Sequence, residues 1–208
     1  MWIAVPPEYR TWGAPPAIEF VDAMMRFIGA DYYIGWLSAA ALHGSAHHAP
    51  QITQIATSRP VRDRVVGRNR LNFNTRSNII NLPTCEKTVR SGAVRISTPE
   101  VTAMDLCSDL VLGAGIDNVA TVIEGLAAEG VLSVKNILSI AQFYSPAVLR
   151  RLGWILENFT NIPDIDLLAK AAASLSASPS VLDYLRKREG TIDSRWSLLV
   201  NAGVESEY

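Results

Sequence analysis

The sequence has few cysteines, a modest charge content and no long apolar run. Its 208 residues include two cysteines, Cys85 and Cys107, which are too few for the disulfide framework of a small secreted domain. No segment approaches the roughly 18–20 consecutive apolar residues that cross a membrane. Residues 1–7 lack the basic start and apolar core of a signal peptide. We therefore expect a cytoplasmic protein with no membrane partner.

The composition indicates a folded chain. Charged residues make up 19% and hydrophobic residues 49% of the sequence, and the formal net charge is −1. These values exclude a disordered chain, a collagen-like repeat and a generally basic nucleic-acid-binding tail. A chain of this length can bury a hydrophobic core without disulfides or metals, in one or two domains.

The sequence also lacks the motifs of common enzymes. It has no phosphate-binding loop with its lysine, and Gly113 and Gly115 lack the preceding strand and the third glycine of a dinucleotide-binding loop. A metal-dependent nuclease strand would place a glutamate and a lysine two residues apart on one face. Glu86 and Lys87 are adjacent, so a strand would point them apart. We expect no enzyme activity and no cofactor.

The three histidines, His43, His47 and His48, raise the alternative of a metal site. His43 and His47 would share one face of a helix. Gly44 is expected to end that helix between them, and no cysteine is near. We therefore expect no metal site, and a histidine that bonds to backbone at the helix end is the simpler interpretation.

Other candidate catalytic groups have simple structural interpretations. Asp105 and Asp109 are four residues apart on a predicted helix, which is more typical of a solvated face than of an acid–base pair. Cys107 falls in an apolar helical pattern and is expected in the core. Cys85 has no visible histidine partner that would make it a nucleophile.

Positive charge is concentrated in the middle of the chain. Residues 59–95 contain eight arginines and one lysine, opposed only by Asp63 and Glu86, so this segment carries +7 and the remainder −8. Such asymmetry indicates contact with nucleic acid or another polyanion. The alternative is a solvated strand face whose arginines pair with the acidic helices that follow.

Residues 64–74 show the alternation of a strand. Val65, Leu71 and Phe73 occupy odd positions, and an extended strand would place them on one face, opposite a basic, amide-bearing face. Gly67 and Asn69 could mark a turn that breaks this register. The polar residues at even positions are Arg64, Arg68, Arg70, Asn72 and Asn74.

The predicted fold class is α+β, with a small, mostly antiparallel sheet in the first half packed against a helical second half. Further strands are predicted at 51–57, 79–82, 86–90, 93–96 and 195–201. Helices are predicted at 18–28 and 36–43. Later helices are predicted to begin at Thr98-Pro99-Glu100 and near Asp117, Ser133, Ser145, Asp164 and Ser178, because capping residues and proline stand at these positions.

Three stretches of the sequence are distinctive together. They read YYIGWLSAAALHG at residues 32–44, RISTPEVTAMDL at 95–106 and RWSLLVNAGVE at 195–205. In this order and spacing they resemble the AbiEi antitoxin family, which are transcriptional regulators of bacterial abortive-infection, type IV toxin–antitoxin systems. The likeness spans nearly the whole chain.

The resemblance implies a non-catalytic antitoxin that represses its own operon and counteracts a nucleotidyltransferase toxin, with which a stable complex is not assumed. It also implies one antitoxin-type domain over 1–208, subdivided as 1–98 (mixed α/β) and 99–208 (mainly helical). Family members usually carry an N-terminal winged helix-turn-helix that binds operator DNA. Residues 2–7 look like the segment after it, so we expect this chain to lack that domain.

Candidate site residues follow from the basic segment and from the first distinctive stretch. Tyr33, Ser38 and His43 are candidates for a recognition surface; the alternative is that they pin a short helix onto the sheet. The remaining alternatives are a nucleic-acid-processing enzyme and a self-association module that forms a homodimer. The candidates for contact with DNA phosphates are Arg62, Arg64, Arg68, Arg70, Arg76 and Arg95.

Overall fold

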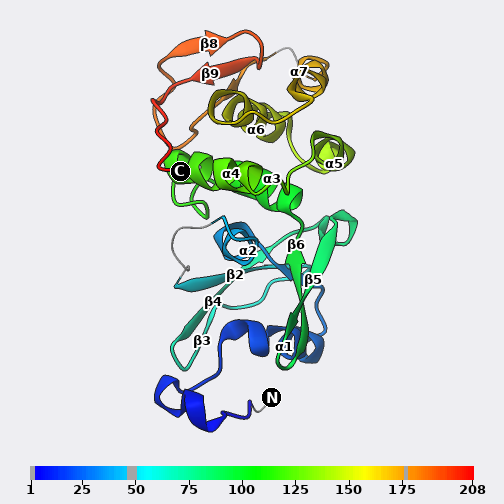
Figure 1. Ribbon diagram of the computed structural model, residues 1–208, viewed down its shortest axis with the longest axis vertical. Helices are drawn as coiled ribbons and strands as arrows, with labels where there is room; N and C mark the ends of the chain where they lie inside the picture. Colours follow the sequence, from blue (N-terminus) through cyan, green and yellow to red (C-terminus); the bar gives the residue numbers. More distant parts are fainter. Residues whose placement is uncertain (1–2, 46–50, 176–177) are drawn as a thin grey trace.

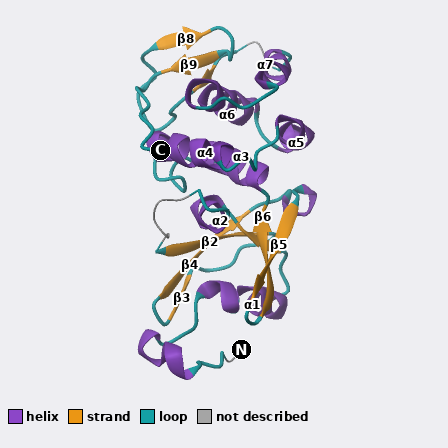
Figure 2. Ribbon diagram, viewed as in Figure 1, coloured by secondary structure: helices purple, strands orange, loops and turns teal. Residues whose placement is uncertain are grey.

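The computed structural model describes residues 3–45, 51–175 and 178–208. The chain is elongated, with a sheet-containing half below and a helical half above (Figure 1). Helix α1 lies under the large sheet, α2 lies on its upper face, and α3 and α4 form the next layer. Figure 2 shows that the strands of the large sheet are confined to the lower half, and that a second, smaller sheet lies at the top.

Among the described residues, the lower half contains three 3-10 turns, two α-helices and six strands. They are η1 (Pro7–Trp12), η2 (Ala17–Glu19), α1 (Val21–Ile28), β1 (Tyr32–Ile34), α2 (Trp36–Leu42), β2 (Ile52–Thr57), β3 (Arg64–Val66), β4 (Asn69–Thr75), η3 (Ile79–Asn81), β5 (Thr84–Val89) and β6 (Gly92–Ser97). The upper half contains α3 (Pro99–Ser108), α4 (Ile116–Ala128), α5 (Val134–Ile140), η4 (Ala141–Phe143), α6 (Pro146–Phe159), α7 (Ile165–Ala173), β7 (Ser180–Val181), β8 (Thr191–Asp193) and β9 (Leu198–Val200).

The large sheet has six strands in the order β3-β4-β2-β1-β6-β5. It is mixed: β2 and β4 are parallel, as are β1 and β6, whereas β1–β2, β3–β4 and β5–β6 are antiparallel. The α+β class holds, but the prediction of a small, mostly antiparallel sheet is wrong. Alternation along one strand indicates that a strand exists, but it does not specify a distant partner or that partner's direction.

Two apolar clusters hold the sheet from opposite sides. The lower cluster packs α1 against the sheet through residues such as Met25, Ile55 and Leu71. The upper cluster joins Tyr33 and Trp36 to α3, α4, α5, α6 and α7. Because this upper cluster includes residues from both sides of position 98, we propose that 1–98 and 99–208 are layers of one folding unit.

Most predicted helix starts are confirmed to within a residue or two. Thr98 caps α3, where its side chain accepts a hydrogen bond from Val101 N–H at 3.4 Å, and Pro99 occupies the first helical position. Helices α4, α5, α6 and α7 begin close to the predicted positions 117, 133, 145 and 164. Within the described ranges, no helix is long and apolar enough to span a membrane.

Two local predictions are wrong. Residues 79–81 form the 3-10 turn η3 instead of a strand, and the segment after Pro179 forms strand β7 instead of a helix. Strand β7 pairs with β9, which confirms the predicted terminal strand. A two-residue strand is too short to show alternation, so its helix-like Ser-Pro start was the stronger local signal.

Helix α6 provides a test of the packing in the upper half. A Cβ atom at Gly153 would lie 2.0 Å from the ring of Trp196, which is fully buried. We expect Gly153→Ala to lower the free energy of unfolding by about 1–3 kcal/mol, because the core must shift to accommodate the methyl group. Chemical denaturation measures this change. Gly203→Ala, where nothing lies within 4 Å, is the matched control and should change stability little; equal effects of the two variants would contradict this packing.

Candidate functional site

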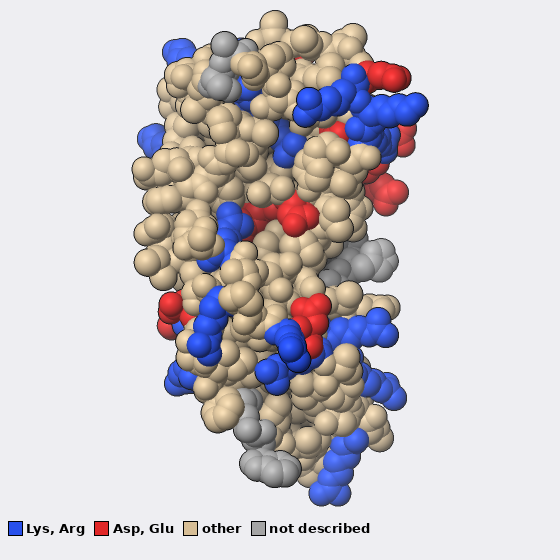
Figure 3. Space-filling model, turned by 180° about the vertical axis from the view of Figure 1, so that it is seen from behind, with Lys and Arg blue, Asp and Glu red and all other residues tan. Residues whose placement is uncertain are grey.

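Four arginines gather at the β3–β4 hairpin. Arg62, Arg64 and Arg70 are exposed, and none forms an ion pair within the ranges that the structure describes. Arg68 lies in the turn, with its guanidinium 5.5 Å from the centroid of the Trp12 ring. Figure 3 shows basic side chains projecting from the lower right edge of the molecule, in the half that contains the sheet. We call Arg62, Arg64, Arg68 and Arg70 the hairpin arginines.

The hairpin changes which arginines share a face. Arg64 pairs with Leu71 across the two strands, and directly paired residues project to the same side of a sheet. Arg64 therefore starts on the face opposite Arg70 and Asn72. The cause is the turn at Gly67, whose φ of +59° suits glycine. The single alternating strand over 64–74 is thus two strands, and the polar face of β4 begins at Arg70.

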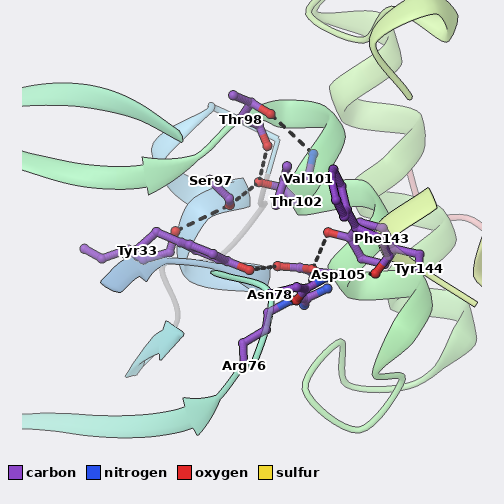
Figure 4. Close-up of polar contacts among 11 residues, drawn as sticks. Tyr33, Arg76, Asn78, Ser97, Thr98, Val101, Thr102, Asp105, Phe143 and Tyr144 are labelled. Atoms are coloured by element: carbon purple, nitrogen blue, oxygen red, sulfur yellow. Dashed lines mark hydrogen bonds and ion pairs between the residues drawn. The ribbon is translucent and has the colours of Figure 1, made fainter. Parts of the chain in front are cut away.

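Arg76 lies just after β4, and its charge is neutralised by a buried acid. Its guanidinium forms an ion pair with the carboxylate of Asp105, whose side chain is fully buried. Tyr33 and Tyr144 each donate a hydroxyl hydrogen bond of 2.7 Å to the same carboxylate. Figure 4 shows these three side chains converging on Asp105 from β1, from the segment after β4 and from the segment after η4.

The environment of this cluster determines its charges. Burial raises the pKa of Asp105, while Arg76 and the two tyrosine hydroxyls oppose that rise by stabilising the carboxylate. Burial and the neighbouring carboxylate raise the pKa of both Tyr33 and Tyr144, so both remain hydrogen-bond donors. The guanidinium also lies 4.8 Å from the centroid of the Tyr144 ring. The cluster is a satisfied ion pair, and Arg76 has little freedom to meet a DNA phosphate.

Arg95 is separated from the hairpin arginines. It lies on β6, three strands away from β4 in the sheet order. Its guanidinium stacks 5.0 Å from the centroid of the Tyr32 ring, and it pairs in register with Glu86. The structure therefore brings Arg62, Arg64, Arg68 and Arg70 together but places Arg76 and Arg95 in other surroundings.

The three candidates for a recognition surface hold α2 and β1 in place. The Ser38 hydroxyl donates to the Ile52 carbonyl at 3.1 Å and accepts from Gln54 N–H at 2.9 Å. His43 Nε2 lies 2.8 Å from the Ser97 carbonyl oxygen. Tyr33 is buried, and its hydroxyl donates a hydrogen bond to Asp105. These contacts favour the interpretation that the residues pin a short helix onto the sheet.

The candidate enzyme groups are engaged in structural contacts. The Asp109 Oδ1 accepts hydrogen bonds from Val111 and Leu112 N–H, which closes the turn after α3. Burial raises the pKa of the Cys107 thiol to about 12, which disfavours a reactive thiolate. The described residues contain no group of three or more His, Cys, Asp or Glu side chains that could hold a metal ion. His47 and His48 lie outside the described residues.

Sequence reasoning missed the cluster around Asp105. Arg76 and Asp105 are 29 residues apart, and Tyr144 lies a further 39 residues along the chain. Asn78 extends the cluster, because its side chain donates to the Phe143 carbonyl oxygen at 2.9 Å. The one available signal was the Asp at an inward position of an otherwise apolar helix, since a buried carboxylate requires a partner.

Comparisons with known proteins identify a family. Residues 33–158 match the AbiEi antitoxin C-terminal domain. A sequence comparison with curated proteins finds no match. The crystal structure of the RV2827C protein from Mycobacterium tuberculosis is similar in fold, with a TM-score of 0.63 at 11% identity over 89% of this chain and 67% of that one.

A second solved structure is only weakly similar. It is an antigenic nucleotidyltransferase-like protein from Paracoccidioides brasiliensis, with a TM-score of 0.38 at 9% identity over 69% of this chain and 98% of that one. A likeness at this level does not show a shared fold.

His43 provides a pH test of the α2 contacts. Burial lowers the pKa of His43, and the nearby Lys87 lowers it further, while the hydrogen bond to the Ser97 carbonyl opposes the shift. Below pH about 6.5, the unfolded chain therefore binds more protons at this position than the folded chain. The stability that neutral His43 contributes is complete above this pH and is lost as the pH falls toward the folded-state pKa.

We expect the wild-type chain to lose more free energy of unfolding between pH 7.5 and 5.5 than His43→Gln does. Urea denaturation at the two pH values measures the difference. Identical pH dependence of the two proteins would show that His43 is not held in the neutral form by its surroundings.

Proposed function

We propose that this chain, which belongs to the AbiEi antitoxin family, acts as the antitoxin of a type IV toxin–antitoxin system and counteracts a nucleotidyltransferase toxin. The family assignment makes it an antitoxin-type regulator of abortive infection. We further propose that it is cytoplasmic and represses its own operon through contact with DNA. The RV2827C likeness supports only the fold.

The state of the ionisable groups supports a non-catalytic role. Asp105 is enclosed by Arg76 and two tyrosines, His43 bonds to a backbone carbonyl, and Cys107 is buried. A general acid or base needs access to its substrate. These groups are instead buried or hydrogen-bonded within the fold. This favours a role in binding a partner over a role in catalysis.

One observation carries the proposal of DNA contact: the exposed hairpin arginines Arg62, Arg64 and Arg70 lack ion-pair partners within the described part of the chain. Exposed guanidiniums that form no ion pair are available to phosphate oxygens. Arg68, held against Trp12, adds a fourth charge at the same edge. Contacts of this kind provide affinity that falls with salt, and they contribute little sequence specificity.

We expect the double variant Arg68→Ala plus Arg70→Ala to bind a DNA duplex from upstream of its own gene more weakly than the wild type. The slope of log affinity against log salt should fall by about one for each phosphate that the variant no longer neutralises. A mobility-shift titration at several salt concentrations measures both. Lys187→Ala plus Arg188→Ala removes two exposed charges from the upper half and is the control. Absence of DNA binding by the wild type at low salt would contradict the proposed contact with DNA.

Bacterial growth tests the proposed antitoxin activity. If a nucleotidyltransferase gene lies beside this gene, cells that express it should stop growing, and they should recover when the chain is co-expressed. Failure to recover, with the chain present in folded form, would contradict the proposal. Recovery without co-purification of the two proteins would support the type IV mechanism, in which the antitoxin need not bind the toxin.

A further inference from the structure

Two pockets lie side by side over the polar face of β4. The first, of about 460 Å³, is lined by Gln54, Arg64 and Arg70. The second, of about 580 Å³, is lined by Trp36, Asn74 and other polar residues near Asp109. Leu112, in the α3–α4 connection, lines both pockets. We call the two pockets together the β4 groove; its floor is the sheet and its wall is residues 108–112.

The β4 groove contains a buried donor and a buried acceptor that lack partners. Trp36 is 4% exposed, and its Nε1–H has no acceptor among the described residues. Gln54 is 8% exposed; its Nε2 donates to the Leu112 carbonyl at 2.8 Å, which fixes the amide, while its Oε1 accepts nothing there. A buried polar atom without a partner costs free energy. Gln54 lines the first pocket and Trp36 the second, so each pocket has beside it one buried polar atom without a partner among the described residues.

The amides on the groove floor are held in fixed positions. Asn74 Nδ2 donates to Asn72 Oδ1 at 2.7 Å, and Asn72 Nδ2 donates to Asp63 at 2.9 Å. Asp63 also accepts Phe73 N–H at 2.8 Å, so its carboxylate is engaged by two donors. This chain of bonds orients the floor before any ligand arrives, which reduces the entropy that binding must overcome.

Charge differs between the two ends of the groove. Arg70 lies on the floor of the first pocket and Arg64 at its edge on β3, while Asp63, which also lines this pocket, has its carboxylate engaged by Asn72 Nδ2 and Phe73 N–H. In the second pocket, the Arg76 charge is neutralised by Asp105, and Asp109 keeps a carboxylate oxygen beyond the one that closes its turn. Phosphate is therefore favoured at the first pocket, and a neutral group with hydrogen-bond donors is favoured at the second.

We propose that the β4 groove binds a nucleotide, with its phosphate at Arg70 and its nucleoside in the pocket lined by Trp36 and Asp109. A nucleoside supplies both acceptors for the indole N–H and donors for carboxylate and amide oxygens. Each pocket lies within the usual size range of small-ligand sites. The nucleotide is either free or one unit of a single strand, since both present the same chemistry. This inference does not need duplex DNA, and so it stands apart from the proposed function.

Calorimetric titration of the full chain with ribonucleoside triphosphates, ribose 5-phosphate, inorganic phosphate and a short single-stranded oligonucleotide tests the proposal. We expect saturable one-to-one binding of a nucleotide or of the oligonucleotide, with phosphate alone and ribose 5-phosphate weaker by at least about tenfold. If a free nucleotide binds as tightly as the strand, the ligand is a free nucleotide; if only the strand binds, it is single-stranded nucleic acid.

Matched variants locate the ligand. Arg70→Gln removes the charge in the first pocket and should weaken binding about tenfold or more. Ser77→Trp fills the second pocket from an exposed position and should also weaken it. Arg62→Gln removes another exposed arginine, which lines neither pocket and has no ion-pair partner in the described part of the chain. It should leave nucleotide affinity within about twofold.

Three results would overturn the inference. They are no saturable binding of any nucleotide or single strand, equal weakening by Arg70→Gln and Arg62→Gln, and phosphate binding as tight as nucleotide binding. Arg68→Ala alone separates the two proposals, because Arg68 lines neither pocket whereas Arg70 lines the first. It should weaken the duplex mobility shift and leave nucleotide affinity unchanged.

Discussion

The buried carboxylate of Asp105 is the interaction on which the arrangement of this molecule depends. It lies on α3, and its partners come from β1, from the segment after β4 and from the segment after η4. Removing a carboxylate from water costs several kcal/mol, which is recovered only when charge and hydrogen bonds are supplied together. The sheet and the helical half must therefore be in register for this site to be satisfied, and the pair selects one way of stacking them.

This constraint positions the surfaces to which we assign function. Arg76 directly follows β4, so its attachment to Asp105 fixes the end of the strand that carries Arg70 and the amides of the β4 groove. Asn78 adds a second attachment through the Phe143 carbonyl. The opposite end of β4 is left as an exposed hairpin, where Arg64 and Arg70 have no ion-pair partner among the described residues. Arg76 is therefore committed to the fold, whereas Arg62, Arg64 and Arg70 at the hairpin have no ion-pair partner among the described residues.

The sequence predicted well what local chemistry determines. Thr98-Pro99 marks the start of α3 because capping needs only neighbouring residues, and the family resemblance rests on three short contiguous stretches in a fixed order. The strand partners were not predictable, because β2 and β4 pair in parallel across intervening chain. The sequence alone places Arg76 among the candidates for DNA contact, because the acid that binds it lies 29 residues away. Arg151 was likewise invisible as a core residue, since the carbonyls that bind it, such as that of Leu182 at 2.5 Å, come from a distant segment.

A double-mutant cycle between Arg76→Met and Asp105→Asn tests the central claim most directly. Arg76→Met alone leaves a buried carboxylate without its cation and is predicted to cost about 3–5 kcal/mol of unfolding free energy. Adding Asp105→Asn should recover part of that cost, which gives a coupling energy of about 1–3 kcal/mol by urea denaturation. Costs that add to within about 0.5 kcal/mol would show that the two residues act independently, and would contradict the account.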